Sequence, residues 1–107
     1  MDEKSRIFAS YVADLHEGQI LRVEPDGTDA IALYRIGDDY FATDDTCTHG
    51  DASLSDGEIV EEYEVECPYH GGRFCIKSGE PTCAPCIIPL KTHKVVVEED
   101  KIFVCLD

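Results

Sequence analysis

The chain has 107 residues, of which 43% are hydrophobic and 30% charged, and this balance indicates one folded globular domain rather than a disordered segment. Nine basic residues against 23 acidic ones give a formal net charge of −14 at pH 7, which would repel nucleic-acid phosphates and anionic membrane surfaces. We therefore expect no nucleic-acid or membrane partner. The charge alone does not decide between a role in solubility and a role in docking.

The beginning of the chain, MDEKSRIFASYVADLHEG, lacks the apolar core of a secretory signal, and no later run approaches the roughly 20 apolar residues of a membrane span. These features predict a cytoplasmic protein. In a reducing compartment, the six cysteines are better explained by metal ligation or free thiols than by a disulfide framework.

Short apolar stretches separated by Gly and Asp fill the first 43 residues, and their pattern favours β-strands over helices. The turns EPDGTD and IGDD contain Gly27 and Gly37, which tolerate positive φ, so we expect two hairpins here. The best helical candidate, Tyr11 to Glu17, is too short to be stable. The predicted strands are residues 6–12, 19–24, 29–36 and 39–43.

The C-terminal stretch HKVVVEEDKIFVCL, residues 93–106, predicts a third hairpin around Glu98, Glu99 and Asp100. Together these elements predict an all-β barrel or sandwich. Residues 43–90 differ from the rest because they contain five of the six cysteines. This stretch is interpreted as a loop-rich module held by something other than a large apolar core.

Two Cys/His pairs in this stretch are the candidate metal ligands: Cys47-x-His49 and Cys67-x-x-His70. Two thiolates and two imidazoles suit either a tetrahedral zinc ion or the outer coordination of a diiron cluster. The spacing favours iron, because each loop supplies one ligand of each sort. A Rieske centre needs that alternation, since one of its irons takes both thiolates and the other takes both imidazoles.

The segments CTHGDASLSDG and CPYHGGRFCIKSGEP closely resemble the Rieske-type ferredoxins of bacterial aromatic-ring-hydroxylating dioxygenase systems. The match is dense over residues 42–80. The resemblance implies an antiparallel β-sandwich or barrel base, about 1–43 and 91–107, and a small cluster-binding subdomain, about 44–90, with both imidazoles near the solvent. In such proteins Pro81 and Pro85 belong to a third loop that covers the cluster.

The same resemblance implies the chemistry. One [2Fe-2S] cluster of the Rieske type would be bound by Cys47, His49, Cys67 and His70. The protein would be a monomeric one-electron carrier in aromatic hydrocarbon catabolism rather than an enzyme. Its partners would be a flavoprotein ferredoxin reductase, which supplies the electron, and the α subunit of a terminal oxygenase, which receives it.

Departures from the high-potential Rieske proteins of respiratory complexes are informative. Those proteins carry an extra cysteine on each loop, where this chain has Ala52 and Tyr69, so no bridge between the loops is expected. They also carry a serine and a tyrosine that donate hydrogen bonds to the cluster, where this chain has Gly72 and Phe74. Without these donors, we expect a reduction potential near the low end of the Rieske range, roughly −150 mV.

The other cysteines and histidines are expected to have structural roles rather than to bind the metal. Cys83 and Cys86 form a C-x-x-C pair, but no helix signal follows that would activate a dithiol. Strand patterns predict that Cys75 and Cys105 are small core residues, that His16 lies on the surface, and that His93 is partly buried and hydrogen-bonded. The glycines after the histidines, Gly50, Gly71 and Gly72, would let the loops turn tightly.

The acids beside the first pair, Asp44, Asp45 and Asp51, are expected near the rim of the cluster. They would lie in a solvated loop or steer a basic partner.

Three other functions compete with this prediction, and the first of them, an oxygenase α subunit, does not fit the sequence. An oxygenase α subunit would need a mononuclear iron site with two histidines and a carboxylate, and after His70 only His93 remains in these 107 residues. The small Rieske-type subunit of an assimilatory nitrite reductase is a second alternative. A structural zinc protein with the same four ligands is the third.

Overall fold

The computed structural model describes residues 6–25, 27, 29–48, 52–68, 71–84 and 88–106. Within these ranges, the strands form three antiparallel sheets, so the predicted all-β fold is confirmed. Two short 3₁₀ helices are also present, η1 (Val12–Asp14) and η2 (Leu54–Asp56). In the described part of the chain, no helix is long and apolar enough to cross a bilayer.

The first sheet pairs the two ends of the chain. Its order is β1, β11, β10, and its strands are β1 (Arg6–Tyr11), β11 (Lys101–Cys105) and β10 (Val95–Glu98). The predicted C-terminal hairpin is observed, because Glu98 pairs with Lys101 and the turn residue Glu99 has a φ of 60°. β1 pairs with β11 rather than with its neighbours in sequence.

The second sheet contains both hairpins predicted for the first half of the chain. Val23 pairs with Ile31 around the first turn, and Ile36 pairs with Asp39 around the second. The order is β2, β3, β4, β9, and the strands are β2 (Ile20–Val23), β3 (Ile31–Ile36), β4 (Asp39–Asp44) and β9 (Thr92–His93). The region proposed as a weak helical candidate contains only η1, in agreement with its short length.

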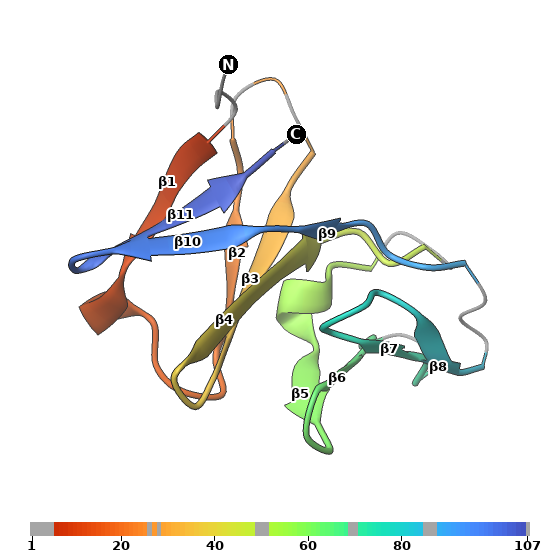
Figure 1. Cartoon of the computed structure of the whole chain (residues 1–107). Helices are drawn as coiled ribbons and strands as arrows, with labels where there is room; N and C mark the ends of the chain where they lie inside the picture. Colours follow the sequence, from red (N-terminus) through yellow and green to blue (C-terminus); the bar gives the residue numbers. More distant parts are fainter. Residues whose placement is uncertain are drawn as a thin grey trace.

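The third sheet is built from the central stretch of the chain. In Figure 1 it lies to the right of the other two sheets, beyond the ends of β4 and β9. Its order follows the sequence, and its strands are β5 (Glu58–Val60), β6 (Glu64–Glu66), β7 (Arg73–Cys75) and β8 (Pro81–Cys83).

Strand β3 is buried on both faces and separates two apolar cores. Ile31 and Leu33 pack with Ile102 and Val104 of the first sheet. Ala32 and Tyr34 face the opposite side and pack in a cluster with residues of the third sheet and its loops. Because side chains alternate along a strand, one continuous apolar run serves two cores. The second of these cores contains the residues of interest.

Candidate metal centre

Cys47 and Cys67 belong to one cluster of buried side chains, although 20 positions separate them in the sequence. Each is 3% exposed. The members of the cluster are Ala32, Tyr34, Cys47, Ala52, Leu54, Val65, Cys67, Phe74, Ile76 and Leu90. The structure therefore brings the two predicted thiol ligands into the same apolar surroundings.

The two cysteines occupy equivalent positions at the base of two loops of equal length. The N–H group of Cys47 donates to the carbonyl of Ala52 at 2.9 Å, and that of Cys67 donates to the carbonyl of Gly72 at 2.8 Å. Each bond encloses four residues, 48–51 in the first loop and 68–71 in the second. We call them the first and second ligand loops.

The pairing just outside each loop is also alike. Thr46 bridges Ser53 below the first ligand loop, and Glu66 pairs with Arg73 below the second. Gly71 has a φ of 70°, which L residues with a side chain rarely adopt, and this supports its predicted role in a tight turn.

His49 and His70, the predicted imidazole ligands, lie outside the described residues, as do Gly50 and Tyr69. By sequence, His49 is the second of four residues in the first ligand loop and His70 is the third in the second ligand loop. The structure thus describes the cysteine half of the predicted ligand set. Elsewhere in the described ranges, no group of three or more His, Cys, Asp or Glu side chains is arranged to hold a metal ion.

Phe74 and Gly72 are the two positions at which the sequence resemblance predicts the loss of hydroxyl donors to the cluster. Phe74 is completely buried in the same cluster as the two cysteines. Gly72 is buried, and its carbonyl accepts the hydrogen bond that closes the second ligand loop. Ala52, at one of the positions of the extra cysteines, is 4% exposed, and Cys47 forms no disulfide.

Two glycines that the sequence analysis did not single out allow close backbone contacts around the loops. A Cβ atom on Gly57 would lie 2.0 Å from the carbonyl oxygen of Glu66, the residue before Cys67. A Cβ atom on Gly79 would lie 2.2 Å from the carbonyl oxygen of Leu90. Both glycines stand in Ser/Asp/Gly/Glu turn sequences, so sequence alone gave no sign that another backbone passes so near.

Pro81, predicted to lie in a third loop, begins strand β8 instead, and Ile88, which follows β8 in the sequence, contacts the first ligand loop. The hydroxyl of Thr48 donates to the carbonyl of Ile88 at 2.7 Å, and the N–H of Leu90 donates to the carbonyl of Gly79 at 2.8 Å. Pro85 and Cys86 lie outside the described residues.

The expectation that Asp45 lies in a charged rim is wrong. Asp45 is 1% exposed and accepts hydrogen bonds from Arg22, from the hydroxyl of Ser53 and from the N–H of Ser55. Asp45 directly precedes the isolated bridge between Thr46 and Ser53, and the three donors satisfy its buried oxygens. Asp51, the third predicted rim residue, lies outside the described residues.

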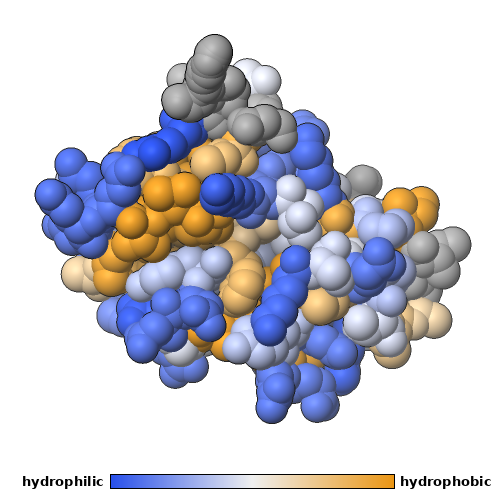
Figure 2. All heavy atoms as spheres, viewed as in Figure 1, coloured by the Kyte–Doolittle hydropathy of each residue, from blue (hydrophilic) through white to orange (hydrophobic). Residues whose placement is uncertain are grey.

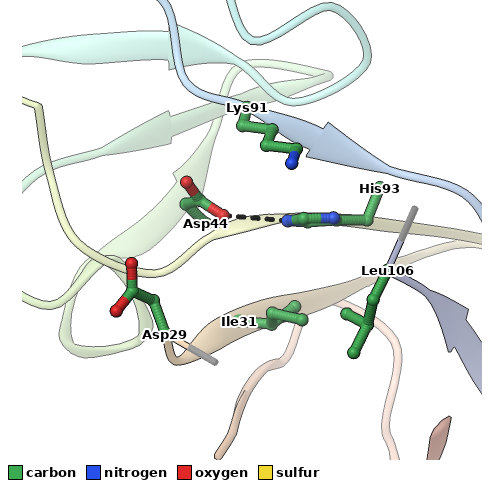
Figure 3. A pocket seen from close by; sticks show the side chains of 6 residues that line it. All are labelled: Asp29, Ile31, Asp44, Lys91, His93 and Leu106. Atoms are coloured by element: carbon green, nitrogen blue, oxygen red, sulfur yellow. Dashed lines mark hydrogen bonds and ion pairs between the residues drawn. The ribbon is translucent and has the colours of Figure 1, made fainter. Parts of the chain in front are cut away.

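The side chain of Asp44 pairs with a histidine rather than with the groups around Asp45. It accepts a hydrogen bond from Nε2 of His93 at 2.8 Å, and the His93 side chain is 7% exposed. Figure 3 shows this pair in a pocket that Lys91, Asp29, Ile31 and Leu106 also line. The prediction of a partly buried, hydrogen-bonded histidine is therefore confirmed. His16 is exposed, also as predicted.

Cys75 and Cys105 do not lie in the core, contrary to expectation. Both are only half buried, and neither belongs to the two buried clusters, because their strand positions face away from them. A hydrogen bond with Ser78 lowers the pKa of the Cys75 thiol, and partial burial opposes this effect. Cys83 is exposed.

Comparison with known proteins decides the family. A model of the Rieske [2Fe-2S] domain matches residues 5–94 of the chain. The chain belongs to this family. The ferredoxin subunit of 3-phenylpropionate/cinnamic acid dioxygenase from Escherichia coli (strain K12) is 43% identical to this Rieske protein over 102 residues, which cover 95% of this chain and 94% of that protein.

Solved structures of ferredoxins also match the fold of this chain. A chain in a complex of reduced oxygenase and oxidised ferredoxin in carbazole 1,9a-dioxygenase matches with a TM-score of 0.90 and 40% identity, over 94% of this chain and 93% of that one. The ferredoxin of carbazole 1,9a-dioxygenase from Nocardioides aromaticivorans IC177 matches with a TM-score of 0.91 and 32% identity, over 97% of this chain and all of that one. The predicted likeness to ferredoxins of aromatic-ring dioxygenase systems is confirmed.

The family implies a [2Fe-2S] cluster, and the described residues fit one. Thiolates are ligands of iron in such clusters, and both thiols lie at the same position of matching loops in one apolar cluster.

Proposed function

We propose that this Rieske protein is a one-electron carrier that binds one [2Fe-2S] cluster through Cys47, His49, Cys67 and His70. It would take an electron from a flavoprotein reductase and deliver it to the terminal oxygenase of an aromatic-ring dioxygenase system. The observation that carries the proposal is the pair of equal loops, each beginning with a buried cysteine.

When bound, such a cluster can accept and return a single electron. The chain's own residues do the rest. Cys47 and Cys67 would bind one iron from inside the apolar cluster, where neighbours such as Phe74 and Leu54 exclude water. His49 and His70, further along the same loops, would bind the other iron.

The surroundings of the cysteines favour a low reduction potential. Hydroxyl donors stabilise the more negative reduced state, and neither Phe74 nor Gly72 has a hydroxyl group. We therefore expect a potential near roughly −150 mV, the low end of the Rieske range. A low potential suits delivery of electrons to an oxygenase.

The proposed partners follow from the relatives. The related carbazole system includes a complex of oxygenase and ferredoxin, which supports the terminal oxygenase as the electron acceptor here. A flavoprotein reductase as the donor, a monomeric state and a cytoplasmic location are further parts of the proposal. The dioxygenase relatives named above favour it over the small subunit of a nitrite reductase.

We also propose that the chain divides into a base and a cluster-binding subdomain, at about residues 44–90. Support comes from the sheets, since β5 to β8 pair only with one another among the described strands. Both ligand loops adjoin this sheet or the segment that leads into it.

Spectroscopy of the purified protein tests the proposal. After dithionite reduction, we expect the electron paramagnetic resonance signal of a Rieske cluster and two irons per chain. Cys47→Ser should abolish the signal, whereas Cys83→Ser, the same change at an exposed thiol, should leave it intact. A colourless protein that contains zinc and gives no signal would favour the zinc alternative.

Electron transfer to a terminal oxygenase tests the functional part separately. The reduced protein should be reoxidised on mixing with an oxygenase of a related dioxygenase system. A protein that holds the cluster but transfers electrons only to a nitrite reductase would support that alternative instead.

A further inference from the structure

We propose that Asp45 is a positioning residue for the metal centre. Its buried carboxylate, held by Arg22, fixes the segment between the two ligand loops and so sets how the loops lie relative to each other. The inference rests on the proposed function, because the relative position of the loops matters if they bind one cluster.

Each oxygen of the Asp45 carboxylate accepts at least one hydrogen bond. Oδ1 accepts from the backbone N–H of Ser55 at 3.0 Å, and Oδ2 accepts from the Ser53 hydroxyl and from Nη1 of Arg22 at 3.2 Å. Asp45 is 1% exposed, whereas the Arg22 side chain is 47% exposed. These donors satisfy both oxygens of a buried carboxylate, and loss of one donor leaves a buried oxygen poorly compensated.

The main chain of Asp45 links the base to η2. Its N–H donates to the carbonyl of Ala30 at 3.0 Å, just before β3, and its carbonyl accepts from the N–H of Leu54 at 2.7 Å. Arg22 comes from β2. Asp45 therefore ties two strands of the second sheet to the segment that follows the first ligand loop.

The same segment reaches the second ligand loop. Gly57 follows η2 directly, its backbone lies against the carbonyl of Glu66, and Glu66 immediately precedes Cys67. Residues 53–57 are thus fixed by Asp45 at one end and lie against the base of the second loop at the other. Since Cys47 follows Asp45 by two positions, a shift of Asp45 would disturb the position of one cysteine relative to the other.

The test compares full-length variants carrying the cluster. Asp45→Asn removes the charge, Arg22→Gln removes its cationic partner, and Arg22→Lys keeps a cation without the guanidinium. Asp38→Asn is the matched control, because Asp38 is fully exposed and lies 3.8 Å from Arg35. Glu24→Gln controls for the other ion pair of Arg22.

The rate at which visible absorbance is lost to an iron chelator measures cluster retention. We expect Asp45→Asn and Arg22→Gln to lose the cluster about 10-fold faster, toward the lower end of the effect seen when direct partners of metal ligands are removed, because Asp45 acts on the loops only through the segment that it fixes. Arg22→Lys should recover part of the loss, and both controls should match the wild type.

The reduction potential separates positioning from a simple effect of charge. Removing the negative charge in Asp45→Asn should raise the potential, and removing the positive charge in Arg22→Gln should lower it. A pure effect of charge therefore shifts the potential in opposite directions in the two variants. A positioning role predicts that cluster retention falls in both. A shift of the g-values in both reduced variants would further support altered ligand geometry.

Retention and g-values equal to the wild type in Asp45→Asn and Arg22→Gln would overturn the inference while leaving the proposed function intact. If Asp45→Asn fails to fold by circular dichroism, the two variants of the half-exposed Arg22 decide by the same criteria. A wild type without iron and sulfide would overturn the proposed function, and this inference with it.

Discussion

Tyr34 places its hydroxyl group in the core that also contains Cys47 and Cys67. The side chain is fully buried, and its hydroxyl lies 2.8 Å from Oγ1 of Thr43. Burial raises the pKa of Tyr34 above its ordinary value; the hydrogen bond with Thr43 lowers it, and the charge of Asp45 raises it. The folded protein therefore disfavours the phenolate at this position.

The raised pKa predicts how stability depends on alkaline pH. Because the folded pKa lies above the unfolded value of about 10, Tyr34 contributes its full stabilisation below pH 10 and loses it progressively above. Urea unfolding followed by circular dichroism should show a free energy of unfolding that falls above pH 10. In Tyr34→Phe this fall should be smaller, and stability at pH 7 should drop by about 1 kcal/mol through the lost hydrogen bond.

Tyr11→Phe is the matched control, because Tyr11 is 44% exposed. Its curve should follow that of the wild type. An identical alkaline fall in Tyr34→Phe would contradict the proposed cause.

Single residues also show where prediction from sequence succeeds. His93 was predicted correctly to be partly buried, although its strand parity with Val97 does not explain this, because Val97 is 42% exposed and lies in another sheet. Asp45 was not, because a carboxylate beside a loop motif is usually solvated. Its burial depends on Arg22, Ser53 and Ser55, and the separation of Arg22 from Asp45 in sequence hides their contact.

At the scale of elements, the close backbone contact at Gly57 is the feature that brings η2 against β6. The residue has an extended conformation, with φ of −90° and ψ of −154°, so any residue could adopt its backbone angles. What requires glycine is the oxygen of Glu66, 2.0 Å from where a Cβ would lie. Steric space rather than backbone strain therefore selects glycine here.

Alanine substitutions at two glycines should separate these causes. Gly57→Ala should destabilise the protein by about 1 to 3 kcal/mol, because the backbones must move apart, and should also speed loss of the cluster. Gly27→Ala has open space but a φ of 74°, so it should cost about 1 kcal/mol and leave the cluster unaffected. Thermal unfolding and visible absorbance measure the two effects. Equal cluster loss in both variants would contradict the role assigned to Gly57.

The hairpins were predictable because local chemistry determines them: Gly27, Gly37 and the Glu98–Asp100 turn each connect strands adjacent in sequence. The pairing of β1 with β11, and of β4 with β9, was not predictable. Their partners are distant along the chain, and no local signal specifies them. In the candidate metal centre, the proposed ligand motif could be predicted from the sequence, whereas the equal closure of the two loops required the structure.

Over the whole chain, 23 acidic residues outnumber nine basic ones. Figure 2 shows hydrophilic residues over most of the visible face, with apolar surface over the sheet of β1, β11 and β10. Exposed apolar side chains of this sheet include Phe8, Tyr11 and Val97. Among the acids, Glu61 and Glu62 are exposed in the turn between β5 and β6.

The net charge of −14 predicts a dependence on salt if it guides docking. Attraction between this surface and a basic patch on the reductase would be screened as ionic strength rises, since the Debye length falls to about 8 Å at 0.15 M. Stopped-flow reduction by the proposed flavoprotein reductase should therefore slow with added salt. Rates independent of salt would assign the charge to solubility alone.

The pairing of β4 with β9 affects which changes in the inserted loops the fold can accept. The N–H of Asp44 donates to the carbonyl of Lys91 at 2.9 Å, and Thr43 pairs with Thr92 beside it. The stretch between β4 and β9, which contains five of the six cysteines, therefore leaves the second sheet and returns to it at neighbouring points. Loops of different length or ligand content could be exchanged between the end of β4 and the start of β9 without altering the path of any strand outside this stretch.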